Sequence, residues 1–460
     1  MSSHDPGQSV CLAAVSGPNI SIEAVLEMQN QLADSQWLEA AELRAQQFEK
    51  ATALVEHAWR TVPWYRERLA IAGIRPGVPL TEADWLRIPI LSRREVQALG
   101  FSLKSDDVPP SHGEVVENRS SGSTGTPVRA LGTVYDALWF KAIELRFHLW
   151  HDRDFEKPLT TIRKRRWHTA AWPEGETYER WGDMATFPFP TGPRYALNTS
   201  ASTAEQLDWL QRRPHHYLMS YPSNVRALAL HCRETGAALA GMAQIITVGE
   251  VVPNELRELC REVFGAVITD GYSAMEVGQL ALQCPEHEHY HVQSERLLVE
   301  VVDDDGQPCG PGQIGRVLVT PLLNYAMPLL RYALGDYAEV GALCECGRGL
   351  PVLTRILGRQ RNTLITPDGG RYWPSFGTTT FLKVAPIVQH QFVQHSVERL
   401  EGRFVVKRPL TEPELVELRE LILSAVPYPF EIELSFHDSL ERSASGKWED
   451  FISHVDAGPR

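Results

Sequence analysis

A succession of strand, helix and strand between residues 244 and 270 restricts the fold of this chain more than any other segment. The β-rich runs 244–248 and 266–270 predict two strands, and residues 253–264 predict the helix between them. A strand that returns through a helix lies parallel to the first, so the chain contains a parallel sheet of the α/β class. Ligands collect at the carboxyl ends of such strands. Gly249 and Glu250, after the first strand, and Asp270, at the end of the second, are therefore candidate binding residues.

The remaining patterns predict a large body and a small C-terminal unit. Apolar residues recur at helical spacing over residues 20–99, and strands alternate with turns after residue 297, which is typical of antiparallel, barrel-like structure. We expect an α/β fold with a large N-terminal body, residues 1–357, made of βαβ parallel-sheet layers and a β-barrel-like part, plus a small mobile α+β C-terminal domain, residues 358–460. Further expected helices cover residues 134–150, 203–212, 223–236 and 412–426, and further expected strands cover residues 298–302, 315–320, 329–332, 404–406 and 431–434.

Charge and cysteine content restrict the partners of the protein. The 460 residues carry a net charge of −13, so neither nucleic acid nor an anionic membrane is an expected partner. The amino terminus has no basic segment, and its apolar run 10–15 is too short for a signal peptide or a membrane span, which predicts a cytoplasmic protein. Seven cysteines, mostly far apart, favour free thiols and leave room for a metal. The basic run 163–166 is interpreted as a solvated face, with contact to a phosphate-bearing ligand as the alternative.

The segment from Ser120 to Pro127 concentrates hydroxyl side chains and glycines in one loop. Glycines allow backbone N–H groups to turn toward one centre, and hydroxyls add further donors, so the loop is suited to holding phosphates. It lacks the lysine that closes a Walker A loop, and a flexible hairpin turn is the alternative interpretation. The candidate phosphate-binding residues are Ser120, Ser121, Gly122, Ser123, Thr124, Gly125 and Thr126.

Four later stretches carry side chains that complement such a loop. The ring of Tyr272 can stack on a base, and the carboxylate of Glu276 can hold Mg²⁺ against phosphates. Asp336, after a tight glycine turn, is suited to accept hydrogen bonds from the two hydroxyls of a ribose. Arg359 begins the last unit, and Lys447 lies near its end. Each residue alone has an ordinary structural explanation, such as a helix-terminal carboxylate, a turn aspartate or a surface lysine.

Taken in order, these motifs make the sequence resemble the adenylate-forming acyl-CoA synthetases, and within them the phenylacetate-CoA ligase branch. The resemblance extends through nearly the whole chain. It rests on the Ser/Thr/Gly loop, the segment from Val62 to Tyr65, the box from Tyr272 to Glu276, residues 320–324 and 327–332, Gly335-Asp336, residues 344–348 and Gly358-Arg359.

The resemblance implies a reaction in two steps. ATP and a carboxylate would form an acyl-adenylate and pyrophosphate, and a thiol would then take the acyl group. We expect a small-molecule carboxylate, aromatic or aryl-acetic, as the substrate, CoA or another acyl acceptor as the partner, and ATP and Mg²⁺ as cofactors. The protein itself could form a homodimer.

The resemblance also implies a role for each candidate residue. The loop 120–126 would hold the β- and γ-phosphates, while Gly249, Glu250 and Asp270 complete the ATP-binding set. Lys447 would bridge the carboxylate and ATP, where charge builds during attack on the α-phosphate. For the rest of the nucleotide, Tyr272 would line the adenine pocket, Glu276 would bind Mg²⁺, and Asp336 would hold the ribose hydroxyls with Arg359 nearby.

Two positions depart from the family pattern. Met275 stands where the family has a hydroxyl residue before the Glu of its box, and Arg361-Asn362 stand where it has two aspartates at the pivot between the domains. The second difference bears more on thioester formation, which is thought to need rotation of the last unit, than on adenylation. The alternatives are an adenylate-forming enzyme with an amine, a carrier-protein thiol or nitrite as the acceptor, and a nucleotide-binding protein without turnover.

Two cysteine-containing stretches form a candidate metal site. One offers Cys344 and Cys346, and the other offers Cys284 and three imidazoles, which together can close a tetrahedral Cys₃His site. Some members of the resembled branch carry such a zinc, and His291 resembles their histidine ligand, so Cys284, His291, Cys344 and Cys346 are the expected set. The Zn²⁺ would be structural, and free thiols with surface histidines are the alternative. The sequence does not decide between His287, His289 and His291.

Overall fold

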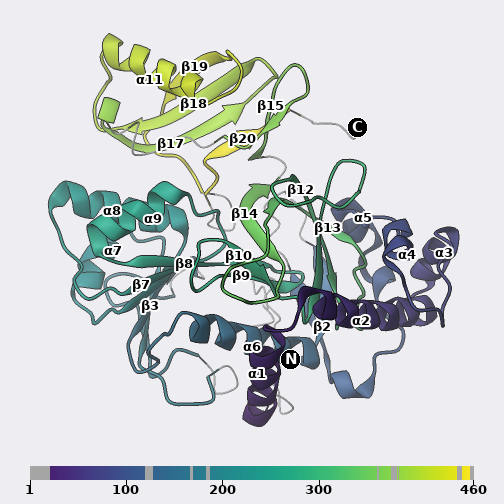
Figure 1. Cartoon of the computed structure of the whole chain (residues 1–460). Helices are drawn as coiled ribbons and strands as arrows, with labels where there is room; N and C mark the ends of the chain where they lie inside the picture. The colour runs from purple at the N-terminus through teal and green to yellow at the C-terminus, as the bar shows by residue number, and fades with distance from the viewer. Residues whose placement is uncertain are drawn as a thin grey trace, which may run out of the picture.

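The protein was analysed as a computed structural model that describes residues 21–119, 128–165, 169–182, 187–359, 362–374, 381, 383–442 and 448–455. Figure 1 shows a large body with a smaller C-terminal unit stacked on one side of it. The body is built on one large mixed sheet, and the C-terminal unit has a four-stranded sheet of its own. The expected fold class is confirmed. None of the described helices is both long and apolar enough to cross a membrane.

Helices fill the first part of the body, as the spacing of residues 20–99 predicted. Two of them begin at hydroxyl residues, Thr81 and Ser92, whose side chains take part in capping boxes. Their apolar faces, which include the buried Tyr65 and Trp85, pack in one cluster with the antiparallel strands of the body. The helices are α1 (Ile22–Ser35), α2 (Ala40–Thr61), α3 (Pro63–Ile71), α4 (Glu82–Arg87) and α5 (Arg93–Leu99), followed by the 3₁₀ turns η2 (Gly100–Leu103) and η3 (Pro110–His112).

A hairpin follows these helices. Strands β1 (Val115–Arg119) and β2 (Arg129–Thr133) pair antiparallel, with Arg119 opposite Arg129. The expected phosphate loop lies between these strands in the sequence, and its residues 120–126 are outside the described part of the chain.

The predicted βαβ unit lies in the parallel half of the large sheet. It consists of β7 (Gln244–Thr247), α9 (Asn254–Phe264) and β8 (Val267–Ala274), and the two strands are parallel. Successive residues of β7 face opposite sides of the sheet. Ile245 packs in the cluster of α9 and its neighbouring helices, and Ile246 packs in a different cluster, so helices cover both faces. The other elements of this half are α6 (Val134–Trp150), β3 (Leu159–Arg163), β4 (Glu176–Tyr178), β5 (Arg194–Asn198), α7 (Thr203–Gln211), β6 (Tyr217–Ser220) and α8 (Pro222–Thr235).

Strand β8 changes its pairing half way along. Thr247 on β7 is the last residue paired parallel with it, opposite Asp270, and from Gly271 onward β8 pairs antiparallel with the next strand. The antiparallel half that follows contains the barrel-like part expected from the sequence. Its strands are β9 (Gly278–Gln283), β10 (Tyr290–Val292), β11 (Leu297–Val302), β12 (Ile314–Pro321), β13 (Tyr332–Val340) and β14 (Val352–Arg359), and the whole sheet has the order β11-β12-β13-β14-β10-β9-β8-β7-β6-β3-β5-β4.

The strand predicted over residues 329–332 begins later than expected. Arg331 has a φ of 49°, outside the extended region, so β13 starts only at Tyr332. The buried Arg331 guanidinium pairs with Glu300, at 2.9 Å between Nη2 and Oε1, and donates to the backbone carbonyls of Leu86 and Ile88. The prediction was wrong here because the apolar run is a buried loop held in place by this arginine.

The C-terminal unit has its own apolar core, which includes Phe392, Phe404 and Leu418. The last strand of the body, β14, extends to Arg359, two residues past the predicted boundary, and residues 360 and 361 are outside the described part. The domain boundary and the mobility of the unit stay predictions. The unit contains β15 (Leu364–Ile365), β16 (Arg371–Tyr372), β17 (Ile387–Gln394), β18 (Arg399–Val406), α11 (Glu412–Ser424), β19 (Glu431–Phe436) and β20 (Phe451–Ser453), with the sheet order β19-β18-β17-β20.

A buried ion pair that joins α6 to the antiparallel half provides a test of the fold. Arg296 Nη2 lies 2.9 Å from Asp136 Oδ1, and both side chains are 1% exposed. Replacing Arg296 by Ala leaves a buried carboxylate without its cation, so we expect the free energy of unfolding to fall by about 3–5 kcal/mol. Urea unfolding measures this change.

The matched control is Arg212→Ala, which removes an ion pair to Asp208 whose arginine is 47% exposed. An exposed pair contributes little to stability, so this variant is expected to unfold like the wild type. If the free energy of unfolding fell equally in the two variants, burial would not explain the contribution of the Arg296–Asp136 pair to stability.

Candidate active site

Two predicted binding residues lie just after β7 and half way along β8. Gly249 follows β7 with a φ of 79°, a left-handed conformation that glycine adopts without strain. Both oxygens of Asp270 accept hydrogen bonds, from Thr247 Oγ1 at 2.7 Å and from the Tyr290 hydroxyl at 2.7 Å. Burial raises the pKa of Asp270 to about 6. Asp270 therefore joins β7 to β10 at the point where the sheet changes from parallel to antiparallel.

Tyr272, Asp336 and Arg359 meet beyond this point. The Tyr272 hydroxyl donates to Asp336 Oδ2 at 2.8 Å, and Arg359 Nε lies 3.6 Å from Asp336 Oδ1. Asp336 and Arg359 are direct partners in the register of β13 and β14. Burial, and then the nearby Asp336 carboxylate, raise the pKa of Tyr272 well above its ordinary value, so the phenol stays a protonated donor. The structure thus brings together three residues that the sequence placed far apart.

Glu276 lies in the turn between β8 and β9 and pairs with an arginine that the sequence analysis missed. Arg93 Nη1 donates to Glu276 Oε1 at 2.7 Å and lies 3.3 Å from the Tyr332 hydroxyl. The Glu276 side chain is 5% exposed. Arg93 stands in the first turn of α5, 183 residues before its partner, and a basic residue there carries no sequence signal of this contact.

Glu250, a predicted ATP-binding residue, faces the C-terminal unit. Its Oε2 accepts from the backbone N–H of Ser223 at 2.9 Å, and its Oε1 accepts from the backbone N–H of Trp448 at 2.6 Å. Burial raises the pKa of Glu250, and the two backbone donors oppose that rise. Both carboxylate oxygens therefore contact protein donors in this arrangement of the two units.

Eight predicted site residues lie outside the described part of the chain, so their contacts stay predictions. The described strands β1 and β2 flank seven of them in the sequence, and Trp448 directly follows the eighth. They are Ser120, Ser121, Gly122, Ser123, Thr124, Gly125, Thr126 and Lys447.

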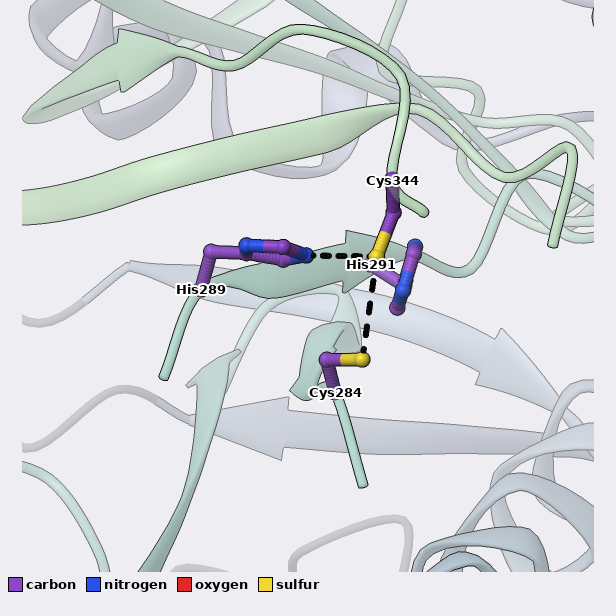
Figure 2. Close-up of side chains that lie close together, drawn as sticks. All are labelled: Cys284, His289, His291 and Cys344. Carbon is purple, nitrogen blue, oxygen red and sulfur yellow. Dashed lines mark hydrogen bonds between the residues drawn. The ribbon is translucent and has the colours of Figure 1, made fainter. Parts of the chain in front are cut away.

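A second group of side chains can hold a metal ion. The ligand atoms of Cys284, His289, His291 and Cys344 lie within 4.8 Å of one another, and Figure 2 shows these side chains converging from separate strands and loops. His289 Nε2 is 3.0 Å from Cys344 Sγ, which is 3.9 Å from Cys284 Sγ. Two thiols and two imidazoles at this spacing suit tetrahedral Zn²⁺.

The structure gathers three of the four predicted ligands and adds His289. Cys346 Sγ lies 3.4 Å from His291 Nε2 but is not part of the four-atom group. Burial lowers the pKa of His291 to about 4, which keeps its imidazole in the neutral form that binds metals. Its other nitrogen, Nδ1, lies 3.3 Å from the Leu350 carbonyl oxygen, a contact that orients the ring.

The loop after the last cysteine is packed against the N-terminal helices. Gly349 N donates to the Gln36 carbonyl at 3.0 Å, and Gln36 Oε1 accepts from Arg348 Nε at 3.0 Å and from Trp150 Nε1 at 2.9 Å. A Cβ atom at Gly349 would lie 1.8 Å from the Leu38 carbonyl oxygen, so this close approach requires glycine. The candidate metal loop, α6 and the link between α1 and α2 therefore form one packed unit.

Comparisons with known proteins find sequence relatives among phenylacetate-coenzyme A ligases. No protein-family model matches the chain. A phenylacetate-coenzyme A ligase of Thermus thermophilus is 27% identical over 396 residues, which cover 83% of this chain and 84% of that protein. A phenylacetate-coenzyme A ligase of Escherichia coli strain K12 is 22% identical over 341 residues, which cover 70% of this chain and 72% of that protein.

Solved structures share the fold. A 2-hydroxyisobutyryl-CoA ligase in the postadenylation state, in complex with 2-HIB-AMP, matches with a TM-score of 0.72 at 18% identity over 91% of both chains. The same ligase in the thioesterification state matches with a TM-score of 0.57 at 20% identity over 92% of both chains.

Fold and sequence together define an adenylate-forming ligase of the acyl-CoA synthetase superfamily. This confirms the family that the motifs predicted. Within the superfamily, the chain is similar in sequence to two phenylacetate-coenzyme A ligases, as the motifs predicted.

The raised pKa of Asp270 predicts a pH-dependent stability. Folding raises this pKa from 3.8 to about 6, so the protonated carboxyl stabilises the fold in acid, and that contribution is lost as the pH rises through about 6. The stability of the wild type relative to Asp270→Asn, which cannot titrate, is expected to fall by about 1.4 kcal/mol between about pH 5 and about pH 7.5. Urea unfolding of both proteins at the two pH values measures this difference. A difference that does not change with pH would show that Asp270 titrates normally.

Proposed function

We propose that the protein uses ATP to convert a carboxylic acid into an acyl-adenylate, with release of pyrophosphate, and then transfers the acyl group to CoA. The observation that carries this proposal is the meeting of Tyr272, Asp336 and Arg359 where the sheet changes its pairing. The fold of the acyl-adenylate-forming ligases and the curated relatives support the same chemistry.

The nucleotide would lie over this group of three residues. The ring of Tyr272 would line the adenine pocket, and its hydroxyl orients the Asp336 carboxylate. A carboxylate has lone pairs for several donors, so Asp336 can accept from both ribose hydroxyls while keeping the bond from Tyr272. Arg359 would add positive charge beside the ribose, and the loop 120–126 would hold the β- and γ-phosphates.

The phosphates would meet their cations near Glu276. Glu276 would hold Mg²⁺, and the Arg93 guanidinium at 2.7 Å orients the same carboxylate from the side of α5. Lys447 would stabilise the charge that develops as the carboxylate attacks the α-phosphate. No protein nucleophile is needed, because the acid itself attacks.

The acid would be aromatic or aryl-acetic. The curated relatives are phenylacetate-coenzyme A ligases, and an aromatic cluster of the body is a candidate lining for the acid pocket. Phe187 is buried against Trp181, at 5.9 Å between ring centroids, and Phe155 lies 4.6 Å from Phe189. An apolar pocket lined by these rings would select acids by size rather than by polar contact.

The metal site would hold structural Zn²⁺. Cys284, His289, His291 and Cys344 provide four ligand atoms, which leaves no open position for a substrate. Metal binding would fix the loop after Cys344, which is packed against the link between α1 and α2. The cytoplasmic location and the homodimer stay predictions from the sequence.

Removal of one thiol tests the zinc site. Cys344→Ser is expected to lose about one zinc per chain and to lower the melting temperature by about 5 °C or more, because metal binding is coupled to folding. His289→Ala should also lose the ion, whereas Cys346→Ser should retain it. Elemental analysis of protein purified without chelator, followed by thermal unfolding, measures both effects.

Cys309→Ser is the matched control, since Cys309 is a free cysteine outside the cluster. Loss of zinc from Cys346→Ser with retention in His289→Ala would support the Cys₃His set instead. A wild type without zinc would rule the site out.

A pyrophosphate-release screen over carboxylic acids, with and without CoA, tests the function. Release with an aryl-acetic acid, and thioester formation when CoA is added, are expected. Lys447→Ala should slow adenylate formation by about 10²–10³-fold, the effect of removing one preorganised charge stabiliser. If pyrophosphate is released but the acyl group is transferred only to an amine or to nitrite, the acceptor is not CoA. No release with any acid would reject the adenylation itself.

A further inference from the structure

Both flanks of the segment that carries Lys447 contact Glu250 of the body, and the N-terminal flank also contacts Ser223. On the N-terminal flank, Arg442 Nη1 donates to Ser223 Oγ at 2.6 Å and lies 3.7 Å from Glu250 Oε1. On the C-terminal flank, the Trp448 backbone N–H donates to Glu250 Oε1 at 2.6 Å. Ser223 N donates to Glu250 Oε2 at 2.9 Å, so the two body residues are also joined to each other.

A third contact lies one turn further along α8. Arg226 Nη1 and Nη2 donate to Asp450 Oδ1 and Oδ2, at 3.1 and 3.2 Å, which is the paired geometry of a strong arginine–carboxylate contact. The Arg226 side chain is 14% exposed. Trp448 Nε1 donates to Asp450 Oδ1 at 2.7 Å. Ser223 and Arg226 are three residues apart on one helix, so they present their side chains on one face.

Another ion pair between the two units is more exposed than the one between Arg226 and Asp450. Lys407 pairs with Glu234, and both side chains are about half exposed. Exposed pairs of this kind contribute little to orientation or stability. The Arg226 and Glu250 side chains are 14% and 6% exposed, and the contacts of Ser223, Arg226 and Glu250 each reach a residue close to Lys447 in the sequence.

We propose that Ser223, Arg226 and Glu250 form a docking face that holds the C-terminal unit in the orientation for adenylation. They are positioning residues for the first half-reaction, and this inference rests on the proposed function. A charge stabiliser misplaced by about 1 Å loses much of its effect, so the flanks of its segment must be held firmly. The second half-reaction needs another orientation of the unit, in which these contacts break.

The variant Arg226→Ala tests the docking face, because Arg226 is not among the residues proposed to contact the nucleotide. Pyrophosphate release in a single turnover is expected to slow by about tenfold or more, the scale of removing one partner of a shielded interface pair. Thioester formation from supplied acyl-adenylate and CoA is expected to stay within about twofold of the wild type. Arg233→Ala, an exposed arginine on the same helix, is the matched control and should change neither rate.

Exchanging the charges gives the rescue. Arg226→Asp and Asp450→Arg should each slow adenylation, and the double variant should recover most of the rate, which a general loss of folding would not allow. Equal slowing of both half-reactions by Arg226→Ala, or no recovery in the double variant, would overturn the docking face.

Hydrogen–deuterium exchange provides a measurement that does not depend on turnover. In Arg226→Ala, backbone exchange in residues 448–455 should rise, while exchange in β18 stays as in the wild type. If the wild type activates no acid, the proposed function fails, and the exchange experiment still decides whether the two units dock through this face. Unchanged exchange in residues 448–455 would overturn the inference.

Discussion

The change of pairing along β8 is the constraint on which the rest of the body depends. A strand that is parallel to one neighbour and antiparallel to the other joins two kinds of sheet, and its central residues serve both. Asp270 marks this point, and its carboxylate binds Thr247 on the parallel side and Tyr290 on the antiparallel side. Tyr272 follows two residues later and therefore points to the same face of the sheet. The proposed nucleotide site can draw residues from both halves because one strand belongs to both.

Buried charges hold the surrounding segments in register. A charged group away from water is tolerated only beside a partner, so each buried pair specifies which distant segments must meet. Arg296 and Asp136 join the start of the antiparallel strands to α6, and Arg146 and Glu295, at 2.8 Å, add a second link between the same regions. Arg93 and Glu276 extend this arrangement to α5. α5 is thus joined to the candidate active site through Arg93.

Local sequence patterns predicted many of the helices and strands, but they did not predict contacts between residues far apart in the sequence. The βαβ unit, α6, and β18 and β19 of the C-terminal unit followed from apolar periodicity, because burial of one face imposes that period. The strand start at residue 329 was wrong because the buried Arg331 converts an apolar run into a loop. Arg93 was missed since its role depends on a partner far along the chain. The participation of His289 was undecided because sequence spacing does not show which ring turns inward.

The site itself divides in the same way. Tyr272 and Asp336 were chosen from family motifs, and the structure joins them by a hydrogen bond that the sequence did not predict. Glu250 was placed with ATP because it follows β7, whereas the structure shows it in contact with the C-terminal unit. A carboxylate at a strand end serves a ligand or a neighbouring domain equally well, and only the assembled fold distinguishes these uses. The roles of Lys447 and of residues 120–126 stay predictions.

The contacts of Gln36 determine how late the region around it can become fully packed during synthesis of the chain. Gln36 emerges early, but Arg348, which donates to its side chain, follows 312 residues later. Growing chains fold domain by domain from the amino terminus, and contacts of such long separation form late. The link between α1 and α2 therefore lacks its contacts with Arg348 and Gly349 until nearly the whole body has been synthesised. These contacts form once the candidate metal loop has been synthesised, so the first helices of the chain are among the last parts of it to become fully packed.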